Sequence, residues 1–452
     1  MNLAYRFGSI FWNTAVLIEN SKANEEEFED EDKKSKGTEY GKIAKAIGEM
    51  QKFGVIISLP NINSSKFTFA PDEKNNRIMF GLKGMSGVGD DAIREILNNR
   101  PYNSFEDFYE RTGVNIGKTT NIALIKAGVF DELENKNRVE IMKDFIYKIS
   151  NPVKKITSTN IKKLIENNLI ADELSLEVRF YNFRKYIFSK KFFFKQDENT
   201  KSKKWYKLNQ VSEQFFYEHF MDNLEENKDY YYEEDASIVV LDKNFDKVYE
   251  TKIQRLKEYI AKDKTLEEYN KIGYMELWNK YCQGTISKWE MDSLNFYHHR
   301  HELADINREQ YSIVNFFGLP EEVEIESTYK KGKTTINIMK LHRLCGTVID
   351  KNTNKNTIEL LTPEGVVTVK FAKGQFTHYN KQLSVVNKET GKKTIVEKSW
   401  FSRGNKIMVV GYKRGDQFVA KRYANSIYQH TVELITRING EYVTTQKERK
   451  KV

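Results

Sequence analysis

The sequence is poor in cysteine and contains no long apolar run. Only two cysteines, Cys282 and Cys345, occur among 452 residues, which excludes a disulfide-stabilised scaffold and favours a reducing compartment. No apolar stretch reaches the ~18 residues that a membrane-spanning helix needs. The first twenty residues also lack the order of basic, apolar and small residues that marks a signal peptide. We therefore expect a soluble, cytoplasmic protein without a membrane partner.

Acidic residues are scarce in one part of the chain only. The net charge is +9, but residues 333–452 contain 23 lysines and arginines against 9 acidic residues, whereas the other 332 residues contain 50 against 55. A basic region of this size attracts polyanions, most often nucleic acid. The alternative is a basic soluble domain without such a ligand. Aromatic residues make up 13% of the chain, which excludes wholesale disorder.

The residue pattern changes along the chain. Residues 1–20 and 38–53 show the apolar spacing of helices, and residues 67–80 alternate like a β-hairpin. Residues 135–290 favour helix throughout. After residue 336, five short β-rich runs alternate with polar turns and predict a small antiparallel barrel. These runs are RLCGTVID, TIELLT, GVVTVKFA, NKIMVVGY and QFVAKRY.

A glycine-containing turn, Gly87-Val88-Gly89, is followed at once by a helix with an acidic start and apolar spacing. Glycines here can adopt positive φ and leave backbone N–H groups uncovered beside a helix N-terminus, which favours a bound phosphate. The pattern is typical of a helix-hairpin-helix element, which holds the nucleic-acid backbone without reading its sequence. The alternative is an ordinary turn at a helix start. The backbone-binding candidates are Lys83, Ser86, Gly87, Val88 and Gly89.

A second turn, LIKAGVFDEL, places Gly128 between an apolar helix and a new start at Asp131. The two turns flank the amphipathic segment 104–113 and predict a tandem pair that shares one core, with Phe105 and Phe108 inside it. Lys126 and Gly128 are the backbone-binding candidates of this second turn.

The predicted barrel would bind a single strand by stacking bases on exposed aromatic side chains in a basic groove. Alternation turns about half of the side chains of a strand inward, so an aromatic such as Phe371 can equally belong to the core. Residues 382–400 predict a β-ribbon, with its turn at Glu389-Thr390-Gly391, that extends the basic surface. The single-strand-binding candidates are Arg343, Lys370, Lys373, Phe376, Tyr379, Trp400, Arg403, Lys406, Tyr412, Lys413 and Arg414.

Four blocks, taken in order, resemble the C-family bacterial replicative polymerases, that is, the DNA polymerase III alpha subunits. They are IAKAIGEMQKFGVIISLPNINSSKFTF (43–69), RIMFGLKGMSGVGDDAIREILNNR (77–100), PYNSFEDFYERT (101–112) and NIALIKAGVFDEL (121–133). WEMDSLNFYHHRHELADI (289–306) is similar to a later block, although Asn295 stands where the family has Gly and Glu302 where it has Pro. The β-rich region resembles the family's OB-fold domain.

The resemblance implies a multidomain α+β chain whose N-terminal two-thirds are mostly helical, with a tandem helix-hairpin-helix, followed by a C-terminal OB-fold-like β-barrel. The expected segments are a fingers-like remnant (1–75), the tandem helix-hairpin-helix domain (76–150), a helical insertion of unknown role (151–288), a connector (289–332), the OB-fold-like domain (333–430) and a basic tail (431–452).

The resemblance covers only the C-terminal part of the family, and the family's palm carboxylates have no counterpart here. Metal-dependent phosphoryl transfer needs converging carboxylates, whereas Asp90-Asp91 begin a helix and the acidic run 25–32 reads as a loop. We therefore assign no catalytic residue, metal ligand or cofactor to this chain. Mg²⁺ is expected in the active site of a partner polymerase chain.

The function implied is DNA replication in the cytoplasm of a bacterium or a phage-infected host. The chain would hold the primer–template duplex and the single-stranded template while another chain supplies the palm, as a gene split within the fingers would produce. One alternative is a stand-alone nucleic-acid-binding factor, and another is an enzyme with an unrecognised site in residues 135–288. An exposed apolar face on residues 7–18 would indicate a partner, whereas burial would favour independence.

Two shorter patterns allow a functional and a structural interpretation. His298, His299 and His301 lie within four residues, but without zinc-ligand spacing, so a turn is favoured over a metal site. QYSIVNFF (310–317) resembles the peptides that bind sliding clamps, and it can equally be a buried linker. The clamp-binding candidates are Gln310, Ile313, Phe316 and Phe317.

Overall fold

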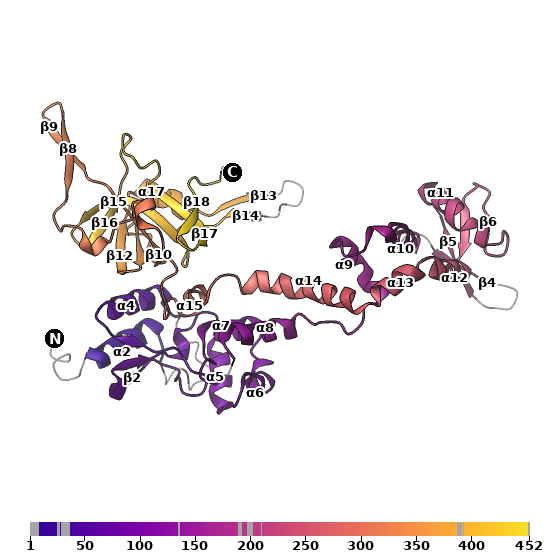
Figure 1. Cartoon of the computed structure of the whole chain (residues 1–452), viewed down its shortest axis with the longest axis horizontal. Coiled ribbons are helices and arrows are strands. Elements are labelled where there is room, and N and C mark those ends of the chain that lie inside the picture. Colours follow the sequence, from indigo (N-terminus) through magenta and orange to yellow (C-terminus); the bar gives the residue numbers. More distant parts are fainter. Residues whose placement is uncertain are drawn as a thin grey trace. The chain divides into compact units, whose positions relative to one another are not determined.

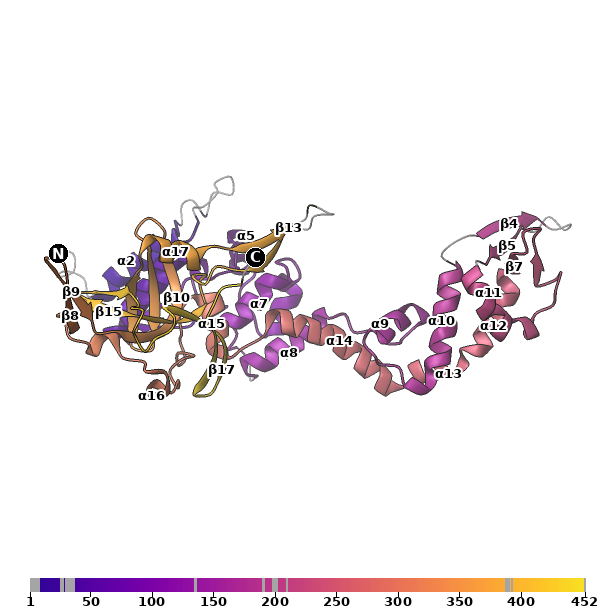
Figure 2. The same cartoon turned by 90° about the horizontal axis from the view of Figure 1, so that it is seen from above.

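In the computed structural model the chain forms two units (Figure 1; Figure 2). Unit 1 combines Met1–Phe145 with Tyr281–Val452, and unit 2, Ile146–Lys280, is inserted between these segments. The structure describes residues 9–24, 28, 37–133, 136–188, 192–196, 202–208, 210–386, 391 and 393–450. No helix in this part of the chain is long and apolar enough to cross a membrane.

Unit 1 begins with two helices and a small sheet. These are α2 (Ser9–Ser21), α4 (Tyr40–Lys52), β1 (Ile56–Ile57), β2 (Ala70–Asp72) and β3 (Arg77–Met79), with the 3-10 turn η1 (Glu73–Asn75) closing the β2–β3 hairpin. β3 is the central strand, parallel to β1 and antiparallel to β2. The predicted helix at 38–53 and the predicted hairpin at 67–80 are confirmed. Residues 1–8, and residues 25–36 apart from Phe28, lie outside the described part.

A helical region with an aromatic core follows. Its elements are η2 (Leu82–Gly84), α5 (Asp90–Asn98), α6 (Phe105–Phe108), the π-helical turn η3 (Tyr109–Gly113), α7 (Lys118–Ala127) and α8 (Arg138–Ile149). Phe130 lies with its ring centroid 5.0 Å from those of both Phe105 and Phe108. Phe105 and Phe108 are buried, as predicted, because their spacing places them on one side of a short amphipathic helix.

The connector returns the chain to unit 1 after the insertion. It contains α15 (Ile286–Leu294), α16 (Arg308–Tyr311) and the 3-10 turn η7 (Phe316–Gly318). Glu290 of α15 is completely buried. Its carboxylate accepts hydrogen bonds from Arg138 Nη1 at 3.2 Å and from the backbone N–H groups of His298 and His299 at 3.0 Å. A buried charge is tolerated only when it is paired and hydrogen-bonded in this way.

The C-terminal strands close into a five-stranded barrel at the predicted positions. They are β10 (His342–Asn352), β11 (Thr357–Thr362), β12 (Gly365–Lys370), β15 (Lys406–Arg414) and β16 (Gln417–Ala420), with α17 (Lys373–Asn380) between β12 and β15. The order is β10-β11-β12-β16-β15, and β15 pairs back onto β10. Only the β12–β16 pairing in this ring is parallel. This is an OB-like barrel.

The segment 431–452, expected to be a basic tail, instead contains two more strands. β17 (Val432–Asn439) pairs with β15, and β18 (Tyr442–Gln446) pairs with β17. Val432 is fully buried in the barrel core, which explains why this stretch forms a strand. Arg449, near the end of the described chain, is also buried and forms an ion pair with Glu397 at 3.0 Å.

Two β-ribbons leave the barrel. The first consists of β8 (Ile325–Lys331) and β9 (Thr334–Met339), and the second consists of β13 (Leu383–Val386) and β14 (Lys393–Glu397). The second ribbon is the one predicted at 382–400. Of its predicted turn, only Gly391 lies within the described residues.

Unit 2 is a mixed domain, whereas the sequence indicated a helical one. Its helices are η4 (Ser158–Asn160), α9 (Ile161–Glu166), η5 (Asp172–Leu174), α10 (Ser175–Phe188), α11 (Gln210–His219), η6 (Met221–Asn223), α12 (Asp242–Lys252), α13 (Gln254–Ile260) and α14 (Asp263–Tyr281). A sheet of β4 (Phe192–Gln196), β5 (Ser202–Lys207), β7 (Ile238–Leu241) and β6 (Tyr230–Tyr232) is added, in that order. β7 is buried along its whole length, as suits its β-branched residues.

The barrel's closure generates a test at Gly411 of β15. A Cβ atom there would collide with the backbone carbonyl of Val419 on β16. We expect Gly411→Ala to destabilise the barrel by about 1–3 kcal/mol, because backbone atoms in a closed barrel cannot move aside. Hydrogen–deuterium exchange of the strand peptides measures this loss locally. The matched control is Gly374→Ala in α17, where the Cβ meets open space and protection should be unchanged or higher.

Candidate nucleic-acid interface

The first hairpin lies between η2 and α5. Gly87 has a φ of +84°, and Gly89 is the N-cap residue of α5. Both glycines are exposed, while Val88 between them is buried and anchors the turn. The N–H groups of Gly87 and Gly89 have no hydrogen-bond acceptor within the described part of the chain. Together with the positive end of α5 they form a surface suited to a phosphate.

The other two candidates near this hairpin hold it in place. Lys83 is buried, and its Nζ lies 2.5 Å from Oδ1 of Asp90. The N–H of Ser86 donates to the carbonyl of Ser293 at 2.7 Å, and its hydroxyl accepts a hydrogen bond from the side-chain amide of Asn295 at 2.9 Å. These contacts fix the hairpin against the start of α5 and against the connector.

A second hairpin, residues 114–117, lies between η3 and α7, and sequence reasoning missed it. Gly117 has a φ of +78° and is the N-cap residue of α7, as Gly89 is of α5. Ile116 precedes it as Val88 precedes Gly89, and Val114, Asn115 and Gly117 are exposed. The signal was an apolar residue and a glycine directly before a helix. It went unnoticed because Asn115 stands where the first hairpin has its other glycine.

The two hairpins differ in charge. The first turn of α5 carries Asp90 and Asp91, which suit the positive end of a helix. The first turn of α7 has no acid and begins with Lys118, an exposed residue that has no ion pair among the described residues. A lysine at this position is unfavourable for the helix itself. The second hairpin is therefore the more attractive of the two for a phosphate.

The turn predicted at Gly128 is not a hairpin tip, which corrects the assignment of Lys126 and Gly128. Gly128 is the buried C-cap of α7, and a Cβ atom there would collide with the guanidinium of Arg138. Lys126 forms an ion pair with Asp292 at 2.9 Å. Both residues therefore serve packing between α7, α8 and α15.

The two hairpins nevertheless share one core, as the predicted tandem arrangement requires. A Cβ atom at Gly87 would lie 3.3 Å from the Cβ of Ala123 on α7. The first hairpin thus lies directly on the helix that the second hairpin begins. The absence of a side chain at Gly87 permits this approach.

Helix α4 covers the outer face of the barrel strands β11 and β12. Lys45 Nζ lies 3.1 Å from Glu359 Oε1 on β11. Ala44 packs with Leu361, and a Cβ atom at Gly48 would lie 2.5 Å from Val366 Cγ2 on β12. OB-fold barrels commonly bind oligonucleotides on the corresponding face. In this chain that face is occupied by the chain's own helix.

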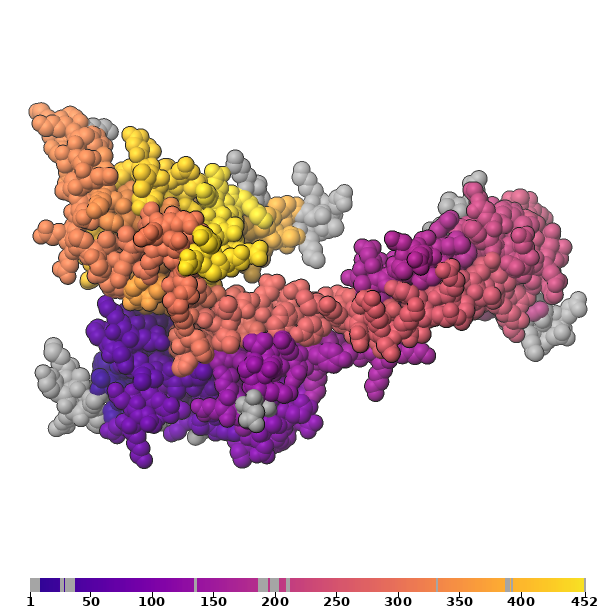
Figure 3. Space-filling view, viewed as in Figure 1, coloured from indigo at the N-terminus to yellow at the C-terminus, as the bar shows by residue number. Residues whose placement is uncertain are grey.

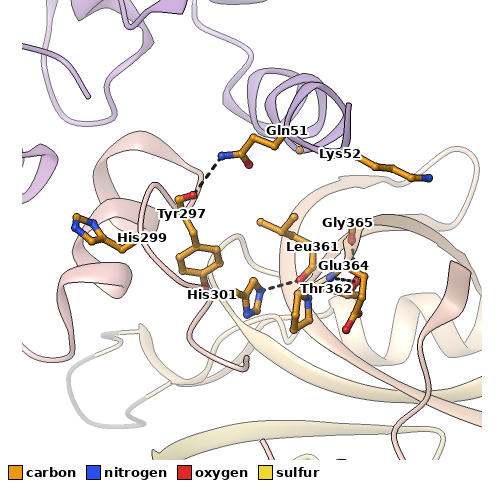
Figure 4. A pocket seen from close by; sticks show the side chains of 11 residues that line it. Gln51, Lys52, Tyr297, His299, His301, Leu361, Thr362, Glu364 and Gly365 are labelled. Carbon is orange, nitrogen blue, oxygen red and sulfur yellow. Dashed lines mark hydrogen bonds between the residues drawn. The ribbon is translucent and has the colours of Figure 1, made fainter. Parts of the chain in front are cut away.

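A polar cavity of about 220 Å³ lies at the edge of this contact, lined by α4, the connector and the β11–β12 turn (Figure 4). Gln51 donates from its side-chain amide to the carbonyl of Tyr297 across the cavity. His301 Nδ1 accepts the N–H of Leu303 at 3.0 Å, so the neutral ring carries its proton on Nε2 and donates it to the carbonyl of Leu361 at 3.0 Å. Burial lowers the pKa of His301 to about 3.

The histidine cluster is otherwise part of the same turn. His299 Nδ1 lies 2.6 Å from Glu290 Oε1, and burial lowers the pKa of His298. Among the described residues, no group of three or more acidic, histidine or cysteine side chains is arranged to hold a metal ion.

Several single-strand-binding candidates are buried, which corrects their assignment. Trp400 is fully buried and donates from Nε1 to Glu397 at 2.9 Å, and Phe376 is 3% exposed. Lys406 is buried in an ion pair with Glu302 at 2.7 Å. Tyr379 is half-buried and stacks on Trp400. Strand alternation could not reveal which aromatic side chains of the loop and of α17 would turn inward.

Three further candidates are held by other parts of the barrel domain. Arg343 forms an ion pair with Glu433 at 3.3 Å, Lys413 donates to the carbonyl of Leu319 at 2.8 Å, and Lys370 donates to the carbonyl of Lys355. The candidates that remain at the surface are Lys373 and Arg414, with Tyr412 half-buried. Arg403 is exposed too, but it donates to Asn295 Oδ1 at 3.2 Å and lies over the ring of Tyr40.

The clamp-binding interpretation of residues 310–317 conflicts with their burial. Phe316 belongs to the barrel core, Phe317 packs against it, and Ile313 packs beside Tyr311. Of the four candidates, Gln310 alone is exposed. The apolar anchors that would enter a clamp groove are thus used within this chain, and the segment is a packed linker.

The position of Trp400 generates a test that separates packing from base stacking. We expect Trp400→Ala to lower the free energy of unfolding of the barrel by about 3–5 kcal/mol, because a large buried side chain is removed. Urea titration with hydrogen–exchange readout measures this change. The control is Trp12→Ala in α2, whose ring is 54% exposed and whose loss should have little effect. Unchanged barrel stability with weakened single-strand binding would contradict the buried position.

The buried His301 generates a pH test. Its pKa in the folded chain is below the ordinary 6.5, so the unfolded chain binds the proton more tightly. The contribution of the neutral His301 to the free energy of unfolding is therefore fully present above pH 6.5. It decreases as the pH falls below 6.5, by up to about 1.4 kcal/mol per pH unit. His301→Gln keeps a hydrogen-bond donor for Leu361 but cannot titrate. Urea unfolding at neutral and acidic pH should show a smaller loss for the variant, and equal losses would contradict the assignment.

Comparison with known proteins agrees with this geometry. Residues 54–141, which include both hairpins, match the helix-hairpin-helix motif family. Over 444 residues, 98% of this chain, it is 42% identical to "Probable DNA polymerase YorL" of Bacillus subtilis (strain 168) and equally to "DNA-directed DNA polymerase" of Bacillus phage SPbeta. It is 34% identical over 123 residues to DNA polymerase III subunit alpha of Aquifex aeolicus (strain VF5), which covers 26% of this chain and 10% of that protein.

The chain spans about a third of the length of the curated relatives that it matches over nearly its whole extent. The helix-hairpin-helix match overlaps the four blocks identified between residues 43 and 133, and the local similarity to DNA polymerase III alpha subunits agrees with the family that those blocks resemble. Over nearly its whole length the chain is therefore similar to part of a phage DNA polymerase, with local similarity to DNA polymerase III alpha subunits.

Proposed function

We propose that this chain is the DNA-holding portion of a C-family replicative polymerase. The observation that carries the proposal is the pair of exposed hairpins on one core, within a chain that is 42% identical to part of a phage polymerase. In this role the hairpins hold the backbone of the primer–template duplex. The barrel engages the single-stranded template, and a separate polymerase chain supplies the catalytic carboxylates and their Mg²⁺.

The hairpins suit a replicative enzyme because they contact phosphates and not bases. Backbone N–H groups at Gly87, Gly89 and Gly117 would donate to phosphate oxygens, and Lys118 would add a positive charge beside them. Contacts of this kind carry no sequence information, so the duplex can move past them at every step of synthesis.

In this proposal the barrel binds the single-stranded template through its loops and edges. The outer face of β11 and β12 is covered by α4, whereas the candidates Lys373 and Arg414 are exposed. Arg403 is exposed as well, but its guanidinium lies over the ring of Tyr40 at the start of α4. Tyr412 is the half-buried aromatic candidate for stacking, which is worth ~1–3 kcal/mol per base.

One observation favours the second candidate function, a stand-alone nucleic-acid-binding factor. α2 turns Ile10 and Leu17 into this chain, and Trp12 is its exposed large apolar side chain among the described residues. A single exposed tryptophan is not a large apolar patch, so α2 by itself does not demand a partner. The two functions share DNA binding and differ in whether a catalytic chain is recruited.

Lys118→Glu tests whether the second hairpin binds the DNA backbone, and this change should leave the fold intact. The change places an acid at the positive end of α7, so thermal stability should be unchanged or slightly higher. Duplex binding should weaken, and the slope of log affinity against log salt should fall by about 1, because one phosphate contact is lost. Fluorescence anisotropy with primer–template DNA measures both. The control is Lys143→Glu on α8, an exposed lysine outside both hairpins, which should bind like wild type.

Primer extension distinguishes the two functions. The purified chain alone should bind primer–template DNA in a salt-sensitive manner and incorporate no nucleotide. Affinity capture from its native source should bring down a second chain and restore synthesis. DNA binding without a catalytic partner would instead favour the stand-alone factor, and incorporation by the isolated chain would overturn the assignment of catalysis to another chain.

A further inference from the structure

The ribbon of β8 and β9 projects away from the body of the barrel (Figure 1; Figure 3). The two strands form a sheet of their own, antiparallel from the pair Ile325–Met339 to the pair Lys331–Thr334. Ile325 is 52% exposed and Tyr329 is 49% exposed. An isolated two-stranded hairpin is marginally stable in water. The ribbon therefore does not serve to complete the barrel core.

The tip of this ribbon is basic. Lys330, Lys331 and Lys333 surround Gly332, and Glu326 is the one acid within β8 and β9. Lys330 and Lys333 have no ion pair among the described residues. At the base of the ribbon the charge of Lys340 is compensated, because Lys340 forms an ion pair with Glu324 at 3.1 Å. Positive charge is thus neutralised at the base and left uncompensated at the tip.

The strand register gives the ribbon one polar face. Lys330 stands opposite Thr335, and Thr328 stands opposite Asn337. All four are exposed. Lysine, threonine and asparagine side chains are donors that commonly contact phosphate oxygens of DNA. The opposite face carries Tyr329, paired with Ile336.

We propose that the β8–β9 ribbon is an arm that enters the major groove of duplex DNA and places Lys330, Lys333 and its polar face against the phosphates. The major groove is about 12 Å wide and admits a two-stranded β-ribbon. At ~3.4 Å per residue, the seven residues of β8 extend roughly 24 Å, so the arm is long enough to cross the groove. This arm rests on the proposed DNA-binding function and adds a contact separate from both hairpins.

Two roles unrelated to DNA would also account for the tip lysines, and both are outcomes of the same test. Lysine on an exposed strand protects against edge-to-edge aggregation, in which case DNA binding would not depend on it. The tip could also meet an acidic protein surface, and then too the DNA affinity would not depend on it. Duplex DNA is favoured because the uncompensated lysines and the hydroxyl and amide donors occupy one continuous face and tip, as a phosphate backbone requires.

The test uses the full chain carrying Lys330→Glu and Lys333→Glu, with a blunt-ended duplex and a single strand as separate probes. We expect duplex affinity to fall roughly tenfold at moderate salt and the salt slope to fall by about 2, because two phosphate contacts are lost. Single-strand affinity should change little. The matched control is Lys398→Glu with Lys447→Glu, two exposed lysines of the barrel domain outside the ribbon. Both proteins should unfold at the wild-type temperature.

A cross-linking experiment gives an independent readout. Both native cysteines are buried, and burial raises the pKa of Cys282 to about 11, so neither should react readily. Thr335→Cys, labelled with a photoactivatable group, should cross-link to duplex DNA. If the charge-reversed protein kept the wild-type duplex affinity, or if no cross-link formed, the proposal that the ribbon binds duplex DNA would be wrong. The proposed function of the whole chain would still stand. Failure of the wild-type chain to bind any DNA would overturn both.

Discussion

The buried carboxylate of Glu290 is the interaction on which the rest of unit 1 depends. It is fully enclosed and accepts hydrogen bonds from Arg138, from two backbone N–H groups and from the ring of His299. Arg138 in turn contacts Asp131 and the carbonyl of Lys126. A charge in this position would be very costly without such partners. The network therefore fastens the end of the helix-hairpin-helix region to the connector, although unit 2 separates them in sequence.

The same connector fixes the barrel. Tyr297 hydroxyl lies 2.9 Å from the hydroxyl of Thr347 on β10, and Glu302 pairs with Lys406 on β15. α4 then closes over β11 and β12, where apolar contact at Gly48 and Ala44 outweighs the partly exposed Lys45–Glu359 pair, since surface ion pairs contribute little. The face that OB-fold barrels commonly use to bind oligonucleotides is thus covered by α4 in this chain and is not accessible to a DNA strand.

The sequence allowed the local parts of this structure to be predicted. Five strands of the barrel and the first hairpin followed from patterns within short segments, where alternation or a glycine pair is sufficient. The second hairpin was missed because Asn115 replaces one glycine, and its position was wrongly assigned to Gly128. The burial of Trp400 and Phe376, and the cover that α4 provides, depend on contacts between segments distant in sequence. Periodicity carries no information about such contacts, so the buried members of the predicted binding groove could not be recognised from the sequence.

The insertion of unit 2 into unit 1 has a consequence for the order of folding. On the ribosome the chain emerges from its N-terminus, and domains fold as units while synthesis continues. The first 145 residues of unit 1 leave the ribosome long before Glu290 and the barrel strands that complete their core. Unit 2 has a continuous sequence and its own core, so it can fold as soon as it has emerged. Unit 2 is thus able to finish folding before unit 1 does, although the hairpins of unit 1 precede it in the sequence.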